Sequence, residues 1–318
     1  MENVSISKKK LELLEEQYAN RIEKTALPNQ IIFTFFPYNC ESVRDYSWGC
    51  AWRCIQSILY NLASNSKFKS ELNHLNFKEI YNFFGRREVL IELYISSDFE
   101  KKTDFSQILE ISTFAPFDLS CGWAEPFIGQ LCLSYFGIKS QLCCLNGVPD
   151  FHNTPEAILE EQIINFKEFK DLLLFYFSSE YRSKISINFE KFVKKINEPF
   201  SLSFSKEKEM ENKESKNNEH YKFEGLPYKA SIMLDDGIFA VLILFAQMKN
   251  NEIEILIGDP HVQENSLEGV CFYSVFLDEE GNKIRDSLTD EQKKHMFHKG
   301  SYEGLHFKEK KWMVLFCT

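Results

Sequence analysis

Residues 45–60 read DYSWGCAWRCIQSILY, and Cys50 stands where this stretch changes from turn-forming to helix-forming residues. Ser47 and Gly49, which both favour turns, bring the chain to the cysteine. Apolar residues then recur at helical spacing, at Trp52, Ile55, Ile58 and Leu59. The pattern predicts a helix over about 49–63 with the thiol in its first turn. Unpaired backbone N–H groups and the positive end of the helix dipole favour a thiolate at that position.

A histidine with a carboxylate two residues before it follows an apolar stretch in the second half of the chain. Residues 252–257 predict a strand, and Asp259-Pro260-His261 comes shortly after it. Residues i and i+2 of an extended segment point to the same side, so Asp259 can approach the imidazole and hold its orientation and tautomer. Pro260 stiffens the pair because its ring fixes φ.

These residues together predict thiol chemistry. A thiol is mostly protonated at neutral pH, so a nucleophilic cysteine needs a nearby base or a lowered pKa. We therefore predict Cys50 as the nucleophile, His261 as the general base and Asp259 as the residue that orients it. The backbone N–H of Cys50 would donate to the oxyanion. The resulting hypothesis is a cysteine hydrolase.

Composition limits the alternatives. The chain has 318 residues, of which 44% are hydrophobic, enough for one large domain or two small ones with a sizeable core. The net charge of −10 argues against a phosphate-binding surface over the whole molecule, and we expect no nucleic-acid partner. The first residues lack the basic and apolar regions of a signal peptide, and no apolar run approaches the roughly 18 residues of a membrane span. We thus expect no transmembrane segment.

The cysteines indicate a reduced compartment. The nine stand at positions 40, 50, 54, 121, 132, 143, 144, 271 and 317, an odd number without facing C-x-x-C pairs. They do not combine with histidines at zinc-ligand spacing, so we expect no metal site and no cofactor. The simplest interpretation is a cytoplasmic protein in which the thiols other than Cys50 are small core residues.

The first half of the chain is predicted to be mostly helical. Residues 5–25 predict a helix within an N-terminal extension, 1–29, and residues 31–36 predict a strand that Pro37 ends. Further helical segments are expected at 77–84 with Asn76 as N-cap, near 104–113, at 127–137 with Gly137 at its end, and twice within 155–197.

The second half predicts a loop followed by strands. Residues 206–222 contain five Lys and five Glu and almost nothing apolar, so we predict a solvated, flexible loop over 205–222. Residues 231–247 and 252–257 predict two strands joined in a hairpin around 249–251. The first is nearly all apolar after Gly237, which is typical of a central strand covered on both faces. A last strand, 312–317, ends the chain.

Two of these stretches resemble motifs of the ubiquitin-fold-modifier-specific proteases. Residues 48–56 (WGCAWRCIQ) are similar to the family's W-G-C-[GA]-Y-R-x-[LIV]-Q, and residues 255–261 (ILIGDPH) to its F-L-I-L-D-P-H. The resemblance covers about 31–145 and 228–261. It implies an α+β, papain-like fold in which the nucleophile begins a helix packed on a central, mostly antiparallel sheet. It also implies a protease domain over 30–318 with an insertion at about 147–228.

The resemblance extends to individual residues around the site. Tyr38, in Tyr38-Asn39-Cys40, falls on a family tyrosine that donates to the oxyanion hole. Residues 123–133 are similar to a family segment that begins with Trp and ends Leu-Cys-Leu. We therefore predict Trp48, Gly49 and Trp123 near the substrate cleft. Trp52 is expected in the core because it falls on the apolar face of the predicted helix.

The chain departs from the family pattern beside the predicted site. Three family glycines become Asp235-Asp236-Gly237, an Ala-His-Thr becomes Ala240-Val241-Leu242, Trp52 replaces a tyrosine, and Val262-Gln263 follows His261. The autophagy-related cysteine proteases, of the same papain-like superfamily, are an alternative. They resemble the chain in W-G-C-M-x-R and in D-P-H with a glutamine two residues later, but match it less well around Tyr38.

The resemblance implies a cysteine peptidase or isopeptidase. Its partner would be a ubiquitin-fold modifier, cleaved after its C-terminal glycine in the precursor or in lysine conjugates. An adaptor could recruit the protein to the cytosolic face of the endoplasmic reticulum. The alternatives are an autophagy-type protease acting on a ubiquitin-like autophagy modifier, and a catalytically poor scaffold that binds the modifier. The altered glycine run and the missing strand histidine motivate the scaffold.

Overall fold

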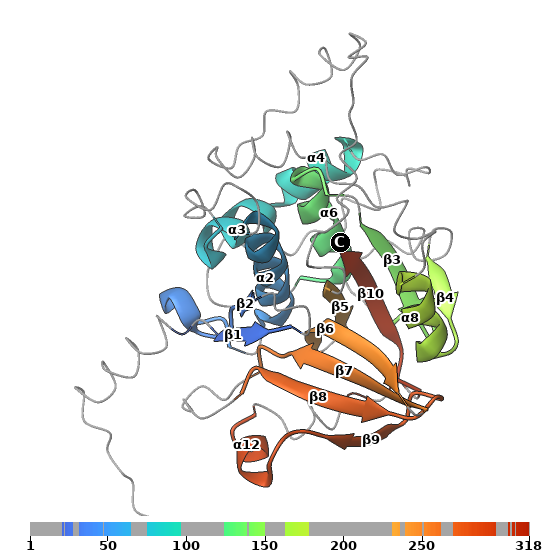
Figure 1. The fold of residues 1–318 in the computed structure, drawn as a ribbon. Coiled ribbons are helices and arrows are strands. Elements are labelled where there is room, and N and C mark those ends of the chain that lie inside the picture. Colours follow the sequence, from blue (N-terminus) through green and yellow to red (C-terminus); the bar gives the residue numbers. More distant parts are fainter. Residues whose placement is uncertain are drawn as a thin grey trace, which may run out of the picture.

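The structure, a computed structural model, describes residues 21, 23–27, 32–46, 48–64, 75–96, 124–138, 140–149, 163–177, 231–235, 239–249, 251–261, 270–296, 305, 307–308 and 310–317. Within these ranges, no helix is long and apolar enough to cross a membrane. The described residues form an α+β fold around one eight-stranded sheet, with a two-stranded sheet beside it (Figure 1).

The strands of the large sheet lie in the order β4-β3-β10-β5-β6-β7-β8-β9. Neighbouring strands are antiparallel except β3 and β4, which are parallel. They are β3 (Gln141–Leu145), β4 (Ile164–Phe166), β5 (Ser231–Asp235), β6 (Ala240–Lys249), β7 (Glu252–Gly258), β8 (Phe272–Leu277), β9 (Lys283–Asp286) and β10 (Trp312–Cys317). The small sheet pairs β1 (Glu23–Ala26) with β2 (Ile32–Phe35).

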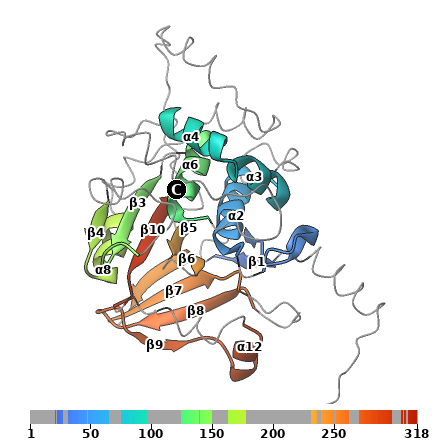
Figure 2. The ribbon, with the colours of Figure 1, turned by 180° about the vertical axis from the view of Figure 1, so that it is seen from behind.

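Helices cover both faces of the large sheet (Figures 1 and 2). One face packs against α2 (Cys50–Ser64), α3 (Phe77–Phe84), α4 (Arg87–Ser96) and α6 (Pro126–Tyr135), whose apolar side chains form a single core cluster with it. The opposite face packs against α8 (Phe169–Phe177). Two short elements complete the described fold, a 3₁₀ turn η1 (Cys40–Ser42) and α12 (Asp290–Lys294).

The surroundings of strand β6 explain why its sequence is apolar at successive positions and does not alternate with polar residues. Ala240, Leu242 and Leu244 belong to the core on the α2 side of the sheet. Val241 and Ile243 belong to the core on the other side. Successive side chains of a strand point to opposite faces, and both faces are covered here, so the positions from Ala240 to Leu244 are all buried. The prediction of a central strand covered on both faces is confirmed.

Several predicted elements are confirmed. Helix α2 begins at Cys50, α3 begins after Asn76, whose side chain accepts from the Glu79 N–H at 2.9 Å, and α6 is followed by Gly137 with φ 75°. Strands β2, β7 and β10 lie where they were expected, but β10 is internal, between β3 and β5. The segments 104–113 and 205–222 lie outside the described residues.

Other predictions are wrong. Residues 231–247 form two strands, β5 and β6, which pair antiparallel with Ile232 opposite Ile243. Residues 23–26, the end of the expected helix 5–25, form β1, and the rest of that helix and of the extension 1–29 lies outside the described residues except residues 21 and 27. Residues 155–197 were expected to hold two helical stretches; the described part, 163–177, contains one helix, α8, and the unexpected strand β4, which pairs with β3 in the main sheet, and the rest of this range lies outside the described residues. Helix α4 and the strands β3, β8 and β9 were not predicted.

Candidate active site

Cys50 is the first residue of α2, and the turn before it places it there. The N–H groups of Trp48 and Gly49 both donate to the carbonyl of Asp45, at 3.2 and 2.8 Å. The Arg53 N–H then donates to the Gly49 carbonyl at 2.8 Å, which is the first hydrogen bond of the helix. The N–H of Cys50 therefore has no acceptor within the helix and lies at the positive end of its dipole.

Gly49 allows the chain to pass very close to a buried carboxylate. A Cβ atom at this position would lie 2.4 Å from Oδ2 and 2.7 Å from Cβ of Asp45. Asp45 is completely buried and cannot retreat without losing its partners. The structure thus gives a reason for glycine at position 49, which is the tight approach of the turn before Cys50 to Asp45; its predicted place near the substrate cleft stays a prediction.

His261 and Asp259 form a compact pair directly after β7. Oδ1 of Asp259 lies 2.6 Å from Nδ1 of His261 and also accepts from the His261 backbone N–H at 2.8 Å. A side-chain oxygen bound to the N–H two residues later is an Asx turn, so the pair meets in a turn rather than on an extended segment. Both side chains are buried. The predicted contact is confirmed.

Tyr273 completes the far end of this pair and was not predicted. Its hydroxyl donates to Oδ2 of Asp259 at 2.7 Å. Tyr273 lies on β8 and pairs with Ile257 on β7. Ile257 precedes Asp259 by two residues, which brings the Tyr273 side chain to the carboxylate. The Asp259 N–H donates to the Cys271 carbonyl at 2.8 Å, which continues the pairing of the two strands. Both oxygens of the buried carboxylate therefore have donors, as its charge requires.

The Cys50 thiol has three hydrogen-bond partners. The donors are the His261 side chain, the Tyr38 hydroxyl and the Ala240 backbone N–H. Burial alone would raise the pKa of the thiol, but the hydrogen bond and positive charge of His261, with the other two donors, lower it below the ordinary value. Burial raises the pKa of five other described cysteines, at positions 40, 132, 143, 144 and 271.

His261 shows the complementary shift. Burial would lower the pKa of its imidazole, but the negative charge of Asp259 and the contact with Cys50 outweigh burial and raise it above the usual value. Burial raises the pKa of Asp259, and the charge of His261 reverses this, so the carboxylate's pKa falls below its usual range. The arrangement favours a thiolate at Cys50, an imidazolium at His261 and a carboxylate at Asp259, each in contact with the next.

Aromatic rings enclose His261 from two sides. The Tyr38 ring lies 5.3 Å from the imidazole at 90°, and the Phe239 ring lies 5.2 Å away at 81°. Tyr46 packs edge-on against Tyr38 in turn, with ring centres 5.7 Å apart. Tyr38, Cys50 and His261 are only 4%, 3% and 2% exposed. The polar centre is therefore almost dry, which strengthens the interactions within it.

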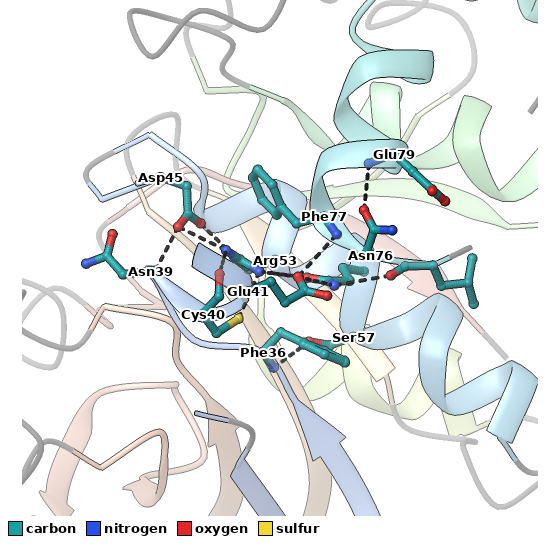
Figure 3. A network of polar contacts seen from close by, with 12 residues as sticks. Phe36, Asn39, Cys40, Glu41, Asp45, Arg53, Ser57, Asn76, Phe77 and Glu79 are labelled. Atoms are coloured by element: carbon teal, nitrogen blue, oxygen red, sulfur yellow. Dashed lines mark hydrogen bonds and ion pairs between the residues drawn. The ribbon is translucent and has the colours of Figure 1, made fainter. Parts of the chain in front are cut away.

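A second polar cluster lies one helical turn after the nucleophile, around Arg53 (Figure 3). Its guanidinium binds Asp45 through Nε at 2.6 Å and Nη2 at 3.0 Å. It also binds the Cys40 carbonyl at 2.9 Å, the Glu41 carboxylate at 2.9 Å and the Gln56 side chain at 3.0 Å. We call these five residues the Arg53 cluster. Arg53 and Gln56 lie in the stretch 48–56 that resembles the family motif, but no site role was predicted for them or for Asp45.

The same face of α2 carries two further polar residues at four-residue spacing. Ser57 accepts from the Phe36 N–H at 3.1 Å. Asn61 exchanges two hydrogen bonds with the backbone of Thr34, at 2.8 and 2.6 Å. Arg53, Ser57 and Asn61 thus bind the segment from β2 to the Arg53 cluster along its length. This i, i+4, i+8 row on a buried helix is the sequence signal that could have identified the cluster.

The predicted tryptophans pack in the core or lie outside the described residues. Trp48 packs edge-on against Phe77 and Tyr81 of α3, with ring centres 5.9 and 5.2 Å apart, which favours a role in the core over one in substrate binding. Trp52 is fully buried, as expected for a core residue. Trp123 lies outside the described residues.

The described part of the chain contains no group of three or more His, Cys, Asp or Glu side chains that could hold a metal ion. Comparison with protein-family models found no match, and none of the curated proteins matches the chain. The resemblance in residues 48–56 and 255–261 therefore rests on those short motifs alone. Any functional conclusion depends on the geometry around Cys50.

Proposed function

We propose that the protein is a cysteine peptidase or isopeptidase of the papain-like type, and that it cleaves after the C-terminal glycine of a ubiquitin-fold modifier. The observation that carries the hydrolase proposal is the chain of contacts from Asp259 through His261 to Cys50 at the start of a helix. The choice of modifier rests on the resemblance of the two motifs. The α+β fold, with α2 packed on a mainly antiparallel sheet, supports both parts.

The first half of the proposed reaction forms a thioester. The Cys50 thiolate attacks the glycyl carbonyl carbon, and the carbonyl oxygen becomes an oxyanion. The Tyr38 hydroxyl, which contacts the sulfur, and the Cys50 backbone N–H at the start of α2 would donate to that oxygen. The bond between carbon and nitrogen then breaks, and the His261 imidazolium gives its proton to the leaving amine. The leaving group is a C-terminal peptide or a lysine side chain.

The second half releases the modifier. Neutral His261 takes a proton from water, which attacks the thioester carbon. The carbon–sulfur bond breaks, the modifier leaves with a free carboxyl group, and the thiolate and imidazolium pair is restored. Asp259, held by Tyr273, keeps Nδ1 of the imidazole occupied, so Nε2 is the atom that exchanges protons with the substrate and water.

The burial of the site supports glycine as the preferred residue. Cys50 and His261 are almost fully covered, and Phe239 stands half-buried against the imidazole. A chain that reaches the sulfur must therefore be thin at the cleaved bond. Glycine has no side chain, so it fits such a path where larger residues would clash with the aromatic rings.

A second candidate is the modifier-binding scaffold with little activity. The observation that favours it is the same burial, because Cys50 is only 3% exposed and a substrate must displace its surroundings to reach it. The lowered pKa of Cys50 argues the other way, since a scaffold has no need of an activated thiol. The two candidates share the partner and differ in turnover.

The remaining parts of the proposal rest on the resemblance and, for the location, on the cysteine pattern. The partner would be a ubiquitin-fold modifier, as a precursor or on lysine, and the location cytoplasmic. Recruitment to the cytosolic face of the endoplasmic reticulum would require an adaptor.

Cleavage of extended modifiers tests the proposed function. A ubiquitin-fold modifier with a C-terminal extension is incubated with the protein beside an extended autophagy modifier and extended ubiquitin. We expect cleavage of the first alone, lost in Cys50→Ala and in His261→Ala. Cys54→Ala, which changes a buried cysteine one turn further along α2, should retain activity. Cleavage of the autophagy modifier alone would move the protein to that protease type. Binding without cleavage of any substrate would favour the scaffold.

A further inference from the structure

The loop after Tyr38 has an unusual backbone. Asn39, Glu41 and Ser42 have φ angles of 61°, 58° and 57°, all in the left-handed region. None of them is glycine, so each costs conformational energy that the surroundings must offset. Such strain persists where neighbouring contacts fix the backbone. The loop begins immediately after the tyrosine that contacts the Cys50 sulfur.

Glu41 is the point where this loop meets two helices. Its Oε2 accepts from Nη1 of Arg53 at 2.9 Å and from Nε2 of Gln56 at 2.8 Å, both on α2. It also accepts from the Phe77 N–H at 3.1 Å, at the start of α3 (Figure 3). The left-handed φ of Glu41 lets its carboxylate turn inward to these three donors. An acidic group at a helix start is also favoured by the helix dipole.

The backbone on both sides of Tyr38 is tied to α2. Two residues before it, the Phe36 N–H donates to Ser57. One residue after it, the Asn39 N–H donates to Oδ1 of Asp45 at 2.7 Å, and Asp45 is held by Arg53. The Tyr38 N–H itself donates to the Pro260 carbonyl at 3.4 Å, next to His261. The backbone around Tyr38 is thus bound both to α2, which begins with Cys50, and to the turn that carries His261.

We propose that Glu41 and Arg53 are positioning residues for the reaction: they hold the left-handed loop 39–42 so that the Tyr38 hydroxyl stays on the Cys50 sulfur and in reach of the oxyanion. Cys50 and Arg53 lie one turn apart on α2 and are both buried. A single rigid helix therefore sets the sulfur and, through the Arg53 cluster, the tyrosine that acts on it. The inference deepens the proposed function and rests on it for the oxyanion role.

Titration of the Cys50 thiolate tests this without any substrate. The ultraviolet absorbance of the thiolate is followed against pH, as the difference between each variant and the same variant carrying Cys50→Ala. Tyr38→Phe removes one donor to the sulfur, so the midpoint pH of the thiolate titration should rise. At a fixed pH near the midpoint, the ratio of thiolate to thiol should fall by about tenfold. Glu41→Gly removes the carboxylate without adding strain at a left-handed position, and should raise the midpoint by a similar amount.

The double variant separates positioning from independent effects. If Glu41 acts through Tyr38, then Tyr38→Phe with Glu41→Gly should match Tyr38→Phe alone. Additive shifts in the double variant, or no shift in Glu41→Gly, would overturn the proposal. An unshifted midpoint in Tyr38→Phe would overturn it as well.

A matched control and a milder variant complete the design. Ser42→Gly changes the next left-handed residue, whose side chain is exposed, and should leave the midpoint unchanged. If Glu41→Gly fails to unfold cooperatively, Glu41→Gln replaces it, because it keeps the shape and removes the charge. Failure to cleave a modifier would refute the proposed function without touching this titration, so the two failures can be told apart.

Discussion

Two polar clusters flank the nucleophile, and they hold their charges differently. On the sheet side, Tyr273, Asp259 and His261 form a line of hydrogen bonds that ends at the Cys50 sulfur. On the helix side, Arg53 has all three guanidinium nitrogens bound within its own cluster. The first cluster reaches the Cys50 sulfur, whereas the charge of Arg53 is paired with the carboxylates of Asp45 and Glu41.

The effect on two buried cysteines shows what this difference means. Cys40 lies beside a permanent cation, since Nη1 of Arg53 is 2.9 Å from its sulfur, yet burial keeps the pKa of Cys40 raised. The pKa of Cys50 is lowered beside His261. The charge of Arg53 is already matched by Asp45 and Glu41, so little of it is left for a thiol. At Cys50 the hydrogen bond and charge of His261 act together with the Ala240 and Tyr38 donors. At Cys40 the charges of Glu41 and Asp45 oppose that of Arg53.

The largest effect is expected from Asp259→Asn, which breaks the sheet-side line. The amide cannot balance an imidazolium, so kcat/KM should fall by about 10²–10⁴-fold. The pH profile gives the sign. The active pair needs a thiolate, present above the lowered pKa of Cys50, and an imidazolium, present below the raised pKa of His261. Removing the Asp259 charge lowers the pKa of His261, so the alkaline limb should move to lower pH. An alkaline limb that stays in place would contradict the assignment.

The next largest effect is expected from Arg53→Met, which breaks the helix-side cluster. It leaves the Asp45 and Glu41 carboxylates without their cation, and loss of one partner of a buried ion pair costs on the order of 3–5 kcal/mol. Urea denaturation measures the free energy of unfolding. The matched control is Arg285→Met, which breaks an exposed pair with Glu252 and should cost about 1 kcal/mol or less. If both variants lost the same free energy of unfolding, the ion pairs of Arg53 would contribute no more to stability than an exposed pair.

Gly49→Ala tests the contact between the nucleophile's turn and the Arg53 cluster. The added methyl group would clash with the Asp45 carboxylate, and we expect a loss of about 1–3 kcal/mol in the free energy of unfolding. Gly147→Ala is a useful comparison, because its nearest neighbour is a flexible lysine side chain 3.8 Å away, although its φ of 98° adds strain. A neutral Gly49→Ala would show that Asp45 can move freely.

The smallest effect is expected from Tyr273→Phe, which removes the hydrogen bond from the Tyr273 hydroxyl to Asp259. Asp259 keeps its contacts with His261, so kcat/KM should fall by less than about tenfold. The lost hydrogen bond raises the pKa of the Asp259 carboxylate, so activity should begin to fall at a higher pH on the acid side. Measuring kcat and KM across pH checks this, and a loss as large as that of Asp259→Asn would mean that Tyr273 does more than hold the carboxylate.

Local signals predicted the elements that carry the site. The helical spacing after Cys50, the N-cap Asn76 and the strand before Asp259 all act within a few residues, so the sequence alone contains them. Residues 231–247 were predicted as one strand because β5 and β6, which pair antiparallel, are both mainly apolar in sequence. Asp235 and Asp236 were a sequence signal against one continuous strand, but were interpreted as part of it.

The supporting residues could not be found in the same way. Tyr273 reaches Asp259 only because β8 pairs with β7, and Glu41 reaches Phe77 only because α3 packs against α2. Such contacts depend on the register of strands and the packing of helices, which single-sequence patterns do not specify. The four-residue spacing of Arg53, Ser57 and Asn61 was the one local sequence pattern that indicated these supporting contacts.

The most direct test of the central claim is to trap the nucleophile with a ubiquitin-fold modifier whose C-terminal glycine carries an electrophile. Intact mass and peptide mapping then show whether and where a covalent bond forms. We expect one adduct, on Cys50, absent in Cys50→Ala and much slower in His261→Ala. Retained adduct formation in Cys54→Ala is the matched control. No adduct with a folded protein, or an adduct on another cysteine, would contradict the account.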